Sequence, residues 1–234
     1  MRWTPRRRSV DKVVTVTMRT PGDDEHLARG FLFNEGVIND PASIDGFNFR
    51  PGDLGDRLTV DLRPGIAIDL CRTGRNFAAT ASCGVCGKTS LEAATPPSPT
   101  IDPGCVPEPP DGLIASLPDR LRHHQPTFDA TGGLHGCGLW VDDAFIATAE
   151  DVGRHNALDK LIGRTLNQTD RRTRAIAVLS GRVGYELVQK TLAAGIPMIV
   201  AVGAPTSLAV DIARRHGQRL IGFCRRGGFN EYTD

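Results

Sequence analysis

From Arg174 onward, short apolar segments alternate with amphipathic ones, and this pattern constrains the fold more than any other feature of the sequence. The segments are RAIAVLS, YELVQKTLAAG, MIVAVG, TSLAVDIARRHG and RLIGFC. Continuous apolar strands separated by helices are typical of a parallel sheet that helices cover on both faces. The sequence therefore predicts an α/β fold here, with right-handed crossovers that bring the strand ends to one side of the sheet.

Each predicted strand of this region is followed directly by a loop that carries glycine together with a hydroxyl or guanidinium group. The loops are Ser180–Arg182, Gly203–Ser207 and Arg225–Gly228. In an open α/β sheet, ligands bind beyond the carboxyl ends of the strands, where helix N-termini favour anions. Arginine is the usual bidentate ligand of phosphate, so Arg182, Arg225 and Arg226 favour a phosphate or nucleotide site over ordinary turns.

A second feature is the segment Thr80–Ser90, TASCGVCGKTS, in which Cys83 and Cys86 are flanked by glycine. A nucleophilic cysteine works as its thiolate and needs an exposed setting with positive charge nearby, which Lys88 supplies. A second thiol close along the chain can stabilise or resolve what the first one carries. We therefore expect an open loop with a reactive cysteine pair.

The same CxxC spacing occurs in zinc sites, and this alternative stays open. Structural zinc normally needs a second ligand pair, and the sequence has no second CxxC and no HxxxH. A mixed site would combine Cys83 and Cys86 with His135 or Cys137. Because this ligand set is incomplete, we expect no bound metal. A structural disulfide is less favoured still, because six cysteines in 234 residues are sparse and no signal peptide precedes them.

Charge and hydropathy argue against two classes of partner. Lys plus Arg number 28 against 27 for Asp plus Glu, and a net charge of +1 is too small for general nucleic-acid binding. No apolar run approaches the roughly 20 residues of a membrane span. Together with the sparse cysteines, this predicts a cytoplasmic protein that binds neither nucleic acid nor a membrane.

A proline-rich segment divides the chain. Residues 95–112, TPPSPTIDPGCVPEPPDG, contain seven prolines, and proline is unsuited to a sheet ladder or a helix interior. We therefore expect a semi-rigid linker at 95–112. It would separate a small N-terminal α+β domain at 1–94, which ends in the CxxC loop, from an α/β domain with a parallel sheet at 113–234.

Local patterns predict three elements before the linker. The β-branched run Val13–Met18 indicates a strand, and so does Arg57–Arg63, where apolar and polar residues alternate. The acidic residues from Asp23 onward suit a helix N-terminus, and the helix is expected to continue to Asn34 and to stop at Gly36.

Beyond the linker, we expect a short helix capped by Ser116 with Pro118 in its first turn. A hairpin is predicted across Asp142-Asp143, followed by a helix that starts near Arg154. Four charged or titratable residues gather at the start of that helix: Glu150, Asp151, Arg154 and His155. His135 lies among glycines, and a role at a site and an ordinary structural role are equally compatible with that setting.

Six motifs of the chain, taken together, point to one family. They are SCGVCGK, TGGLHGCGLW, EDVGRHNALDKLIG, SGRVGYELVQK, APTSLAV and GFCRRGGFNEY. This set resembles the formate dehydrogenase accessory sulfurtransferases, the FdhD family, from about MRTPGDDEHLARGFLFNEGVI to the C-terminus. EDVGRHNALDK is long and unusual, which makes the match specific.

The resemblance implies a function that the residues alone do not. Members of this family accept sulfur as a persulfide from a cysteine desulfurase and pass it to the molybdenum of a bis-molybdopterin guanine dinucleotide cofactor, which activates formate dehydrogenase. On this chain, the persulfide cysteine matches Cys83, and Cys86 is the second thiol. The cofactor contact matches Phe223, Cys224, Arg225, Arg226, Gly227 and Gly228. The resemblance also implies a cytidine deaminase-like α/β/α sandwich and a homodimer.

Two other functions compete with sulfur transfer. A zinc-dependent deaminase needs an HxE motif and a PCxxC motif. Here Ser82 precedes Cys83, and His135 is followed by Gly136 and Cys137. A chaperone that binds the cofactor or the apoenzyme without chemistry would leave the CxxC pair idle. A persulfide on Cys83, stoichiometric zinc, or neither would distinguish the three.

Overall fold

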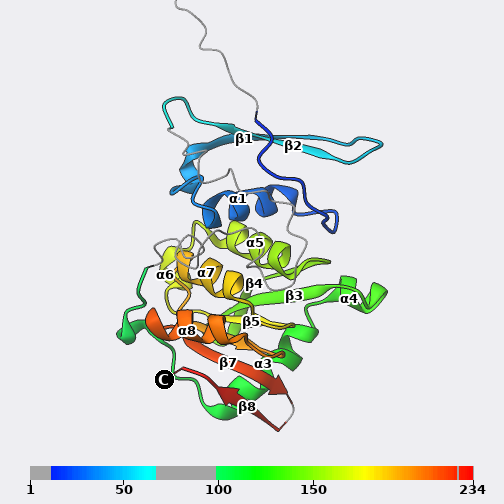
Figure 1. Cartoon of the computed structure of the whole chain (residues 1–234). Coiled ribbons are helices and arrows are strands. Elements are labelled where there is room, and N and C mark those ends of the chain that lie inside the picture. Colours follow the sequence, from blue (N-terminus) through cyan, green and yellow to red (C-terminus); the bar gives the residue numbers. More distant parts are fainter. Residues whose placement is uncertain (1–11, 67–98, 226, 234) are drawn as a thin grey trace, which may run out of the picture.

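The structure of the protein is a computed structural model that describes residues 12–66, 99–225 and 227–233. Its largest element is a six-stranded sheet with the order β4-β3-β5-β6-β7-β8 (Figure 1). The strands are β3 (His135–Val141), β4 (Ala144–Asp151), β5 (Ile176–Leu179), β6 (Met198–Ala201), β7 (Arg219–Arg225) and β8 (Gly228–Glu231). β5, β6 and β7 pair in parallel, which confirms the predicted parallel sheet.

Helices cover both faces of this sheet. One face carries α5 (Arg154–Thr165), α7 (Tyr185–Ala193) and α8 (Ser207–Arg215), and their apolar residues form one cluster with the sheet. The other face packs on α3 (Asp111–Arg122) through a second cluster that includes Trp140 and Val178. Two shorter helices, α4 (Pro126–Thr131) and α6 (Thr169–Arg172), lie in connections. The predicted α/β class, with helices on both faces, is confirmed.

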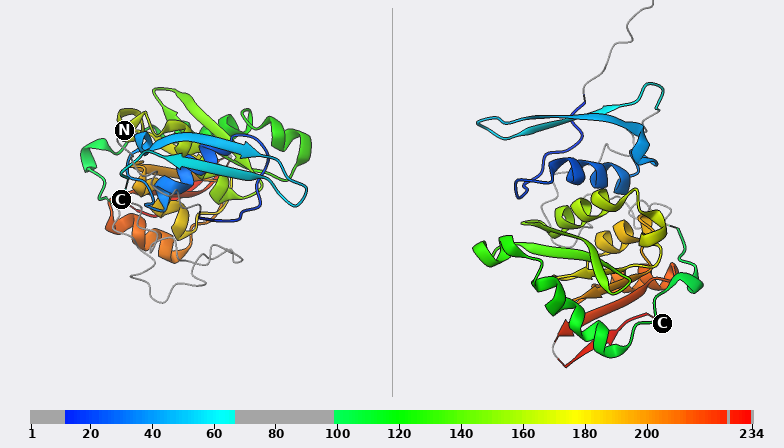
Figure 2. Two further views of the ribbon diagram at one scale, coloured as in Figure 1. Left: turned by 90° about the horizontal axis from the view of Figure 1, so that it is seen from above. Right: turned by 180° about the vertical axis from the view of Figure 1, so that it is seen from behind.

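The N-terminal part lies on top of the α5 layer (Figures 1 and 2). Helix α1 (Asp24–Asn34) packs on α5, and a two-stranded ribbon lies beyond α1. The ribbon consists of β1 (Ile44–Arg50) and β2 (Arg57–Leu62), and the one-turn helix η1 (Pro41–Ser43) precedes it. The predicted helix to Asn34 and the predicted strand from Arg57 are therefore confirmed.

Helices α1 and α5 approach each other at two glycines. A Cβ atom on Gly30 would lie 1.9 Å from the backbone oxygen of Asp159, and one on Gly163 would lie 1.9 Å from that of His26. No side chain fits at either distance. Only glycine lets the two helix backbones come this close, and the contact fixes the N-terminal part against the helix that begins at the candidate site.

One prediction for the N-terminal part is corrected, and one strand there was not predicted. The structure has no strand at Val13–Met18, because these residues have no ladder partner among the described residues. Val14 packs on the apolar cluster that includes Leu32 and Val37, and Met18 accepts a hydrogen bond from Asn156 at the start of α5. Conversely, β1 was not anticipated, because IDGFNFR lacks a continuous alternation of apolar and polar residues. β-Branched residues favour a strand only where a neighbouring strand completes the hydrogen-bond ladder.

The predicted helix at Ser116 is also corrected, since α3 begins at Asp111 and contains Pro118 in its interior. Proline has no N–H to donate to the carbonyl four residues earlier, which is that of Ile114. The thiol of Cys224 donates to this oxygen instead, at 3.2 Å. A side chain from β7 therefore satisfies the acceptor that Pro118 leaves open, and the helix continues through the proline.

The described part of the proline-rich linker is tied to the α/β part. It contains one turn of helix, η2 (Pro103–Cys105). The Ile101 N–H donates to the His216 carbonyl at 2.8 Å, and the Arg219 guanidinium donates to the Pro107 carbonyl at 3.1 Å. The three-part division at 1–94, 95–112 and 113–234 stays a prediction.

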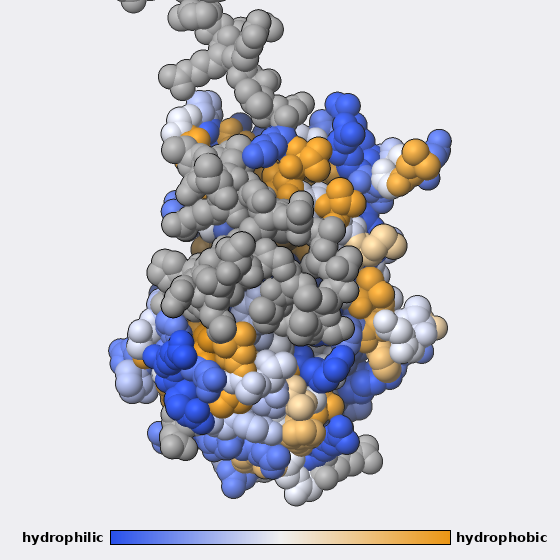
Figure 3. All heavy atoms as spheres, viewed as in Figure 1, coloured by the Kyte–Doolittle hydropathy of each residue, from blue (hydrophilic) through white to orange (hydrophobic). Residues whose placement is uncertain are grey.

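The surface mixes charged and apolar side chains on the face drawn in Figure 3, with apolar groups gathered over the β1–β2 end. Phe49 and Leu54 are exposed large apolar residues of that ribbon. Across the residues that the structure describes, every helix is too short or too polar to cross a bilayer.

Candidate functional site at the carboxyl edge of the sheet

Four strands of the sheet end on the same side. β3 runs antiparallel to both β4 and β5, so β4 has the same direction as the parallel strands β5, β6 and β7. Helices α5, α7 and α8 therefore all begin on this side, and β3 begins there too. We call this side the carboxyl edge; it consists of His135 and residues 151–155, 180–186, 203–207 and 222–225.

The loops after β5, β6 and β7 are hydrogen-bonded to one another. The Gly203 N–H donates to the Gly181 carbonyl at 3.0 Å, and the Phe223 N–H donates to the Gly203 carbonyl at 3.2 Å. A Cβ atom on Gly203 would meet the Arg182 backbone at 2.8 Å, so glycine is required there. The three loops that the sequence singled out thus form one continuous rim.

The end of β7 places the predicted cofactor contacts in different settings. Phe223 has φ of +52° and is exposed, as is Arg225. Positive φ is strained for an aromatic residue and occurs here where the β7–β8 register shifts. Gly227, at φ +99°, and Gly228 are exposed, whereas Arg226 lies outside the described residues.

Cys224 points away from the carboxyl edge. Its side chain is buried against α3, and this burial raises the pKa of the thiol to about 11. Its thiol donates to the Ile114 carbonyl, as described above. A ligand at the edge would therefore contact only the backbone of Cys224. With that restriction to the backbone, the cofactor contact at this residue stays a prediction.

His135 lies at the first residue of β3, directly across from Asp151. Its Nδ1 atom lies 3.1 Å from where a Cβ atom on Gly181 would be, so the ring packs on the loop after β5. Burial, followed by the charges of Arg154, His155 and Arg182, lowers the pKa of His135. The structure therefore places His135 within the candidate site.

The next residue couples β3 to the loop after β5. The Gly136 N–H donates to Ser180 Oγ at 2.9 Å, and the Ser180 N–H donates to the Gly136 carbonyl at 3.0 Å. Ser180, one of the predicted loop residues, thus uses its hydroxyl to hold the start of β3. This reciprocal pair fixes the position of His135 relative to the loop.

His155 and Glu186 connect the starts of α5 and α7. His155 Nε2 lies 3.0 Å from Glu186 Oε2, and both side chains are about one-third exposed. The sequence had placed His155 at a helix start, but the sequence spacing gave no sign of its partner, because Glu186 comes from another helix. The carboxyl edge therefore holds an imidazole–carboxylate pair beside His135.

Most polar side chains of the EDVGRHNALDK motif bind neighbouring elements of the fold. The backbone N–H groups of Thr127 and Phe128 donate to the Glu150 carboxylate at 2.9 and 2.7 Å, so Glu150 satisfies donors at the start of α4. Asp159 accepts from the Lys190 ammonium at 2.6 Å and from the Asn34 amide at 2.6 Å. These contacts join α5 to α7 and to α1.

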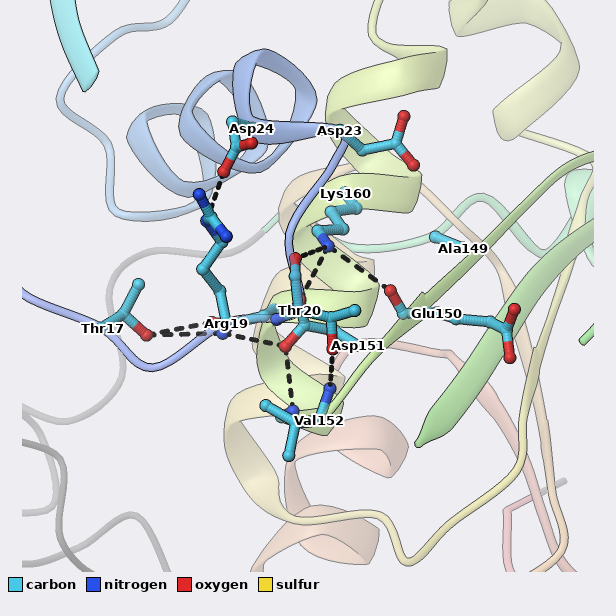
Figure 4. Close-up of polar contacts among 12 residues, drawn as sticks. Thr17, Arg19, Thr20, Asp23, Asp24, Ala149, Glu150, Asp151, Val152 and Lys160 are labelled. Carbon is cyan, nitrogen blue, oxygen red and sulfur yellow. Dashed lines mark hydrogen bonds and ion pairs between the residues drawn. The ribbon is translucent and has the colours of Figure 1, made fainter. Parts of the chain in front are cut away.

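Asp151 and Lys160 of the same motif hold an N-terminal segment, residues 17–20, against the start of α5 (Figure 4). Both side chains are buried, with Lys160 Nζ 2.7 Å from Asp151 Oδ2. Lys160 also donates to the Thr20 carbonyl at 2.8 Å, and the Thr20 N–H donates to Asp151 Oδ2 at 3.0 Å. The buried pair thus has hydrogen-bond partners on the N-terminal segment itself.

A further contact of this segment reaches the first turn of α5. The Asn156 amide donates to the Met18 carbonyl at 2.8 Å and to Asp151 Oδ1 at 3.2 Å. The Val152 N–H donates to Thr20 Oγ1 at 2.9 Å. The N-terminal segment therefore lies beside the carboxyl edge, which the sequence did not indicate.

The predicted catalytic residues, Cys83 and Cys86, lie outside the described residues, so their assignment stays a prediction. Cys137 lies in the core, where burial raises the pKa of its thiol above the usual range. Across the described residues, no three His, Cys, Asp or Glu side chains converge as a metal site would require. Because Cys83 and Cys86 lie outside the described residues, the structure does not test a zinc site that includes them.

Comparison with known proteins gives a consistent result. The model of the FdhD/NarQ family matches residues 9–234. The "Sulfur carrier protein FdhD" of Streptomyces coelicolor is 44% identical over 232 residues, covering 95% of this chain and 82% of the relative. The protein of the same name from Mycolicibacterium paratuberculosis is 44% identical over 231 residues, covering 94% and 84%.

A solved structure is also similar. It is the crystal structure of a protein from Desulfotalea psychrophila that is described as a formate dehydrogenase accessory protein. The likeness has a TM-score of 0.67 at 27% identity and covers 96% of this chain and 83% of that one.

Proposed function

This chain belongs to the FdhD/NarQ family, and from that premise we propose that it is a sulfur carrier that activates formate dehydrogenase. Cys83 takes persulfide sulfur from a cysteine desulfurase, with Cys86 as the second thiol of the pair. The sulfur then passes to the molybdenum of a bis-molybdopterin guanine dinucleotide cofactor, which is the substrate of the protein. The protein acts as a cytoplasmic homodimer and needs no metal of its own.

One observation supports this function most strongly: three helix N-termini and three linked loops converge on the carboxyl edge. The backbone N–H groups of a first helical turn have no partner within the helix, and the helix dipole makes that end attractive to phosphate. The exposed Arg182 and Arg225 add positive charge at two places on the rim. A guanine dinucleotide carries a diphosphate, which this arrangement suits.

The loading step can be written with its electrons balanced. The Cys83 thiolate attacks the terminal sulfur of the desulfurase persulfide, a new S–S bond forms on Cys83, and the desulfurase thiolate leaves. Delivery as sulfide requires two electrons, and the Cys86 thiol supplies them. Attack of Cys86 on the Cys83 sulfur releases the terminal sulfur as sulfide and leaves a Cys83–Cys86 disulfide.

The test of the carrier role is intact-mass analysis after incubation with a cysteine desulfurase and cysteine. We expect the wild-type chain to gain the mass of sulfur and Cys83→Ala to gain none at that position, with loss of formate dehydrogenase activation. Cys137→Ala is the matched control, because Cys137 is buried in the core, and it should load normally. A Cys83→Ala variant that still loads sulfur and supports activation would refute the assignment to Cys83.

The cofactor contact is tested separately with GDP as a partial mimic of the substrate. Arg225→Ala should weaken GDP binding by about 1.5–3 kcal/mol, the range for a hydrogen bond to a charged group. Persulfide loading should be unchanged, because loading requires the desulfurase and not the cofactor. Equal affinity of wild type and Arg225→Ala in calorimetric titration would remove Arg225 from the mechanism.

A further inference from the structure

A cavity lies at the end of the sheet opposite the carboxyl edge. It is found where α5 and α7 end and where the chain enters β5 and β6, and its volume is about 280 Å³. Three parts of the chain line it: the N-terminal part, the α/β part and the linker. The lining includes Phe33, Pro41, Pro99, Leu166, Arg172 and Ala193. We call it the junction cavity.

Much of the wall of the junction cavity is apolar. Phe33 and Pro41 contribute from the N-terminal part, and Leu166 and Ala193 contribute from the α/β part. An apolar protein cavity of about 150 Å³ holds a benzene molecule. The junction cavity therefore has room for a ring-sized apolar group together with a polar one. Boundaries between parts of a chain are also preferred places for small-molecule sites.

Arg172, in α6, is the charged residue of this wall, and only 4% of its surface is exposed. Its Nε atom donates to the Ala194 carbonyl at 3.1 Å, after the end of α7. Its two terminal nitrogens donate to the Thr165 carbonyl and, at 3.3 Å, to Thr169 Oγ1. A guanidinium group has five N–H donors, so these contacts leave two of them for another acceptor.

The positive charge of Arg172 has no carboxylate partner within residues 12–66, 99–225 and 227–233. Burial lowers the pKa of this guanidinium, and no acidic side chain of these residues offsets the effect. A buried charge is normally paired. The two helix ends compensate it only in part, because Arg172 binds one carbonyl of each, and the terminal partial charge of a helix is spread over the carbonyls of its last turn.

We propose that the junction cavity binds a small organic carboxylate, whose anionic group pairs with Arg172 and whose apolar body packs on Phe33, Pro41 and Leu166. The two oxygens of a carboxylate can accept the two remaining N–H groups of the guanidinium. A single buried positive charge matches a monoanion, and the apolar wall suits a carbon skeleton better than a phosphate. This site goes beyond the carrier role and does not depend on Cys83 or on the carboxyl edge.

Occupation of the cavity has a consequence for the fold. The ligand would contact the N-terminal part on one side and the α/β part on the other, so it adds to the contacts that hold the two together. A ligand that binds only the folded chain raises its stability by mass action. Local opening at the end of α1 should then become rarer, which slows exchange of the backbone amides of Val37 and Ile38.

The experiment uses the full chain, with benzoate as the probe and benzamide as its uncharged counterpart. In calorimetric titration, we expect saturable binding of benzoate to wild type, roughly tenfold or more tighter than that of benzamide, because only benzoate supplies the missing counter-ion. Benzoate should also raise the midpoint of thermal unfolding. In hydrogen exchange, it should protect Val37 and Ile38, a readout that binding elsewhere on the surface would not move.

Two variants test the cavity itself. Arg172→Gln removes the buried charge, and its matched control is Arg171→Gln, at an exposed arginine of the same helix. Ala193→Leu fills the cavity with a residue that suits a helix, and its control is Ala130→Leu, at an exposed alanine of α4. Both cavity variants should weaken benzoate binding by roughly tenfold or more, and both controls should change it less than about twofold.

Arg172→Gln also loses hydrogen bonds to two helix ends, so Ala193→Leu keeps the test decisive if that variant does not fold. Three results would overturn the proposal: no saturable binding of benzoate to wild type, equal affinity for benzoate and benzamide, or equal benzoate affinity of Ala193→Leu and Ala130→Leu. Benzoate binding that is lost in Arg225→Ala but kept in Ala193→Leu would place the anion at the carboxyl edge and refute the junction cavity, while leaving the carrier role intact.

Discussion

Replacement of Gly163 by alanine tests the contact that fixes α1 against α5. The new Cβ atom would lie 1.9 Å from the His26 carbonyl oxygen, and ordinary contact begins at 3.4 Å, so the helices must separate by up to 1.5 Å. Separation also stretches the Asn34–Asp159 hydrogen bond, now 2.6 Å long. Overpacking of this kind costs about 1–3 kcal/mol or more, whereas alanine gains about 1 kcal/mol over glycine inside a helix.

We therefore expect Gly163→Ala to lower the free energy of unfolding by about 2 kcal/mol, measured by equilibrium unfolding in urea. The matched control is Gly112→Ala in α3, where a Cβ atom would meet nothing within 4 Å. That variant should be neutral or stabilised by up to about 1 kcal/mol. If Gly163→Ala were as stable as Gly112→Ala, the close approach of the two helix backbones would be wrong.

Two further predictions concern Asp151 and His135 at the carboxyl edge. Asp151→Asn leaves the Lys160 ammonium buried without its carboxylate, so it should lower the free energy of unfolding in urea by about 3–5 kcal/mol. The control is Asp142→Asn, in an exposed turn with φ +49°, and its free energy of unfolding should stay within about 0.5 kcal/mol of wild type. A loss at Asp151 no greater than at Asp142 would contradict the buried network. Burial and the cationic neighbours of His135 lower its pKa in the folded state. Between pH 6.5 and this lowered pKa, His135 therefore binds more protons in the unfolded chain than in the folded chain. Wild type should therefore lose stability relative to His135→Gln as the pH falls from 6.5 through the lowered pKa, and parallel stability profiles of the two proteins would refute this.

Much of the fold follows from local pattern. The strands β5 and β6 are buried on both faces, so the sequence shows them as unbroken apolar runs between helices, and their direction follows from the crossovers. The β3–β4 hairpin follows from Asp142-Asp143, whose φ values of +49° and +66° are those of a tight two-residue turn. Because these signals lie within a few residues of each other, they can be seen before any tertiary contact is known.

The candidate site was anticipated in part. Because parallel strands must end on one side, the sequence was sufficient to predict that the loops at Ser180, Gly203 and Arg225 meet. It did not show that β4 runs in the same direction as these strands. That direction depends on β3 being inserted between β4 and β5, and it is what brings His135 and His155 to the same edge.

Only the tertiary structure decided what several individual residues do. Val13–Met18 has the composition of a strand, yet the half-buried Asn156 binds the end of this segment and the buried Asp151 binds the following Thr20, beside α5. Pro118 looks like a helix start, but the Cys224 thiol, more than 100 residues away, satisfies the carbonyl it leaves open. Hydrogen-bond partners so distant in sequence leave no local pattern. The sequence by itself determined most of the helices and strands of the α/β part and their order, and packing determined which partners their polar groups found.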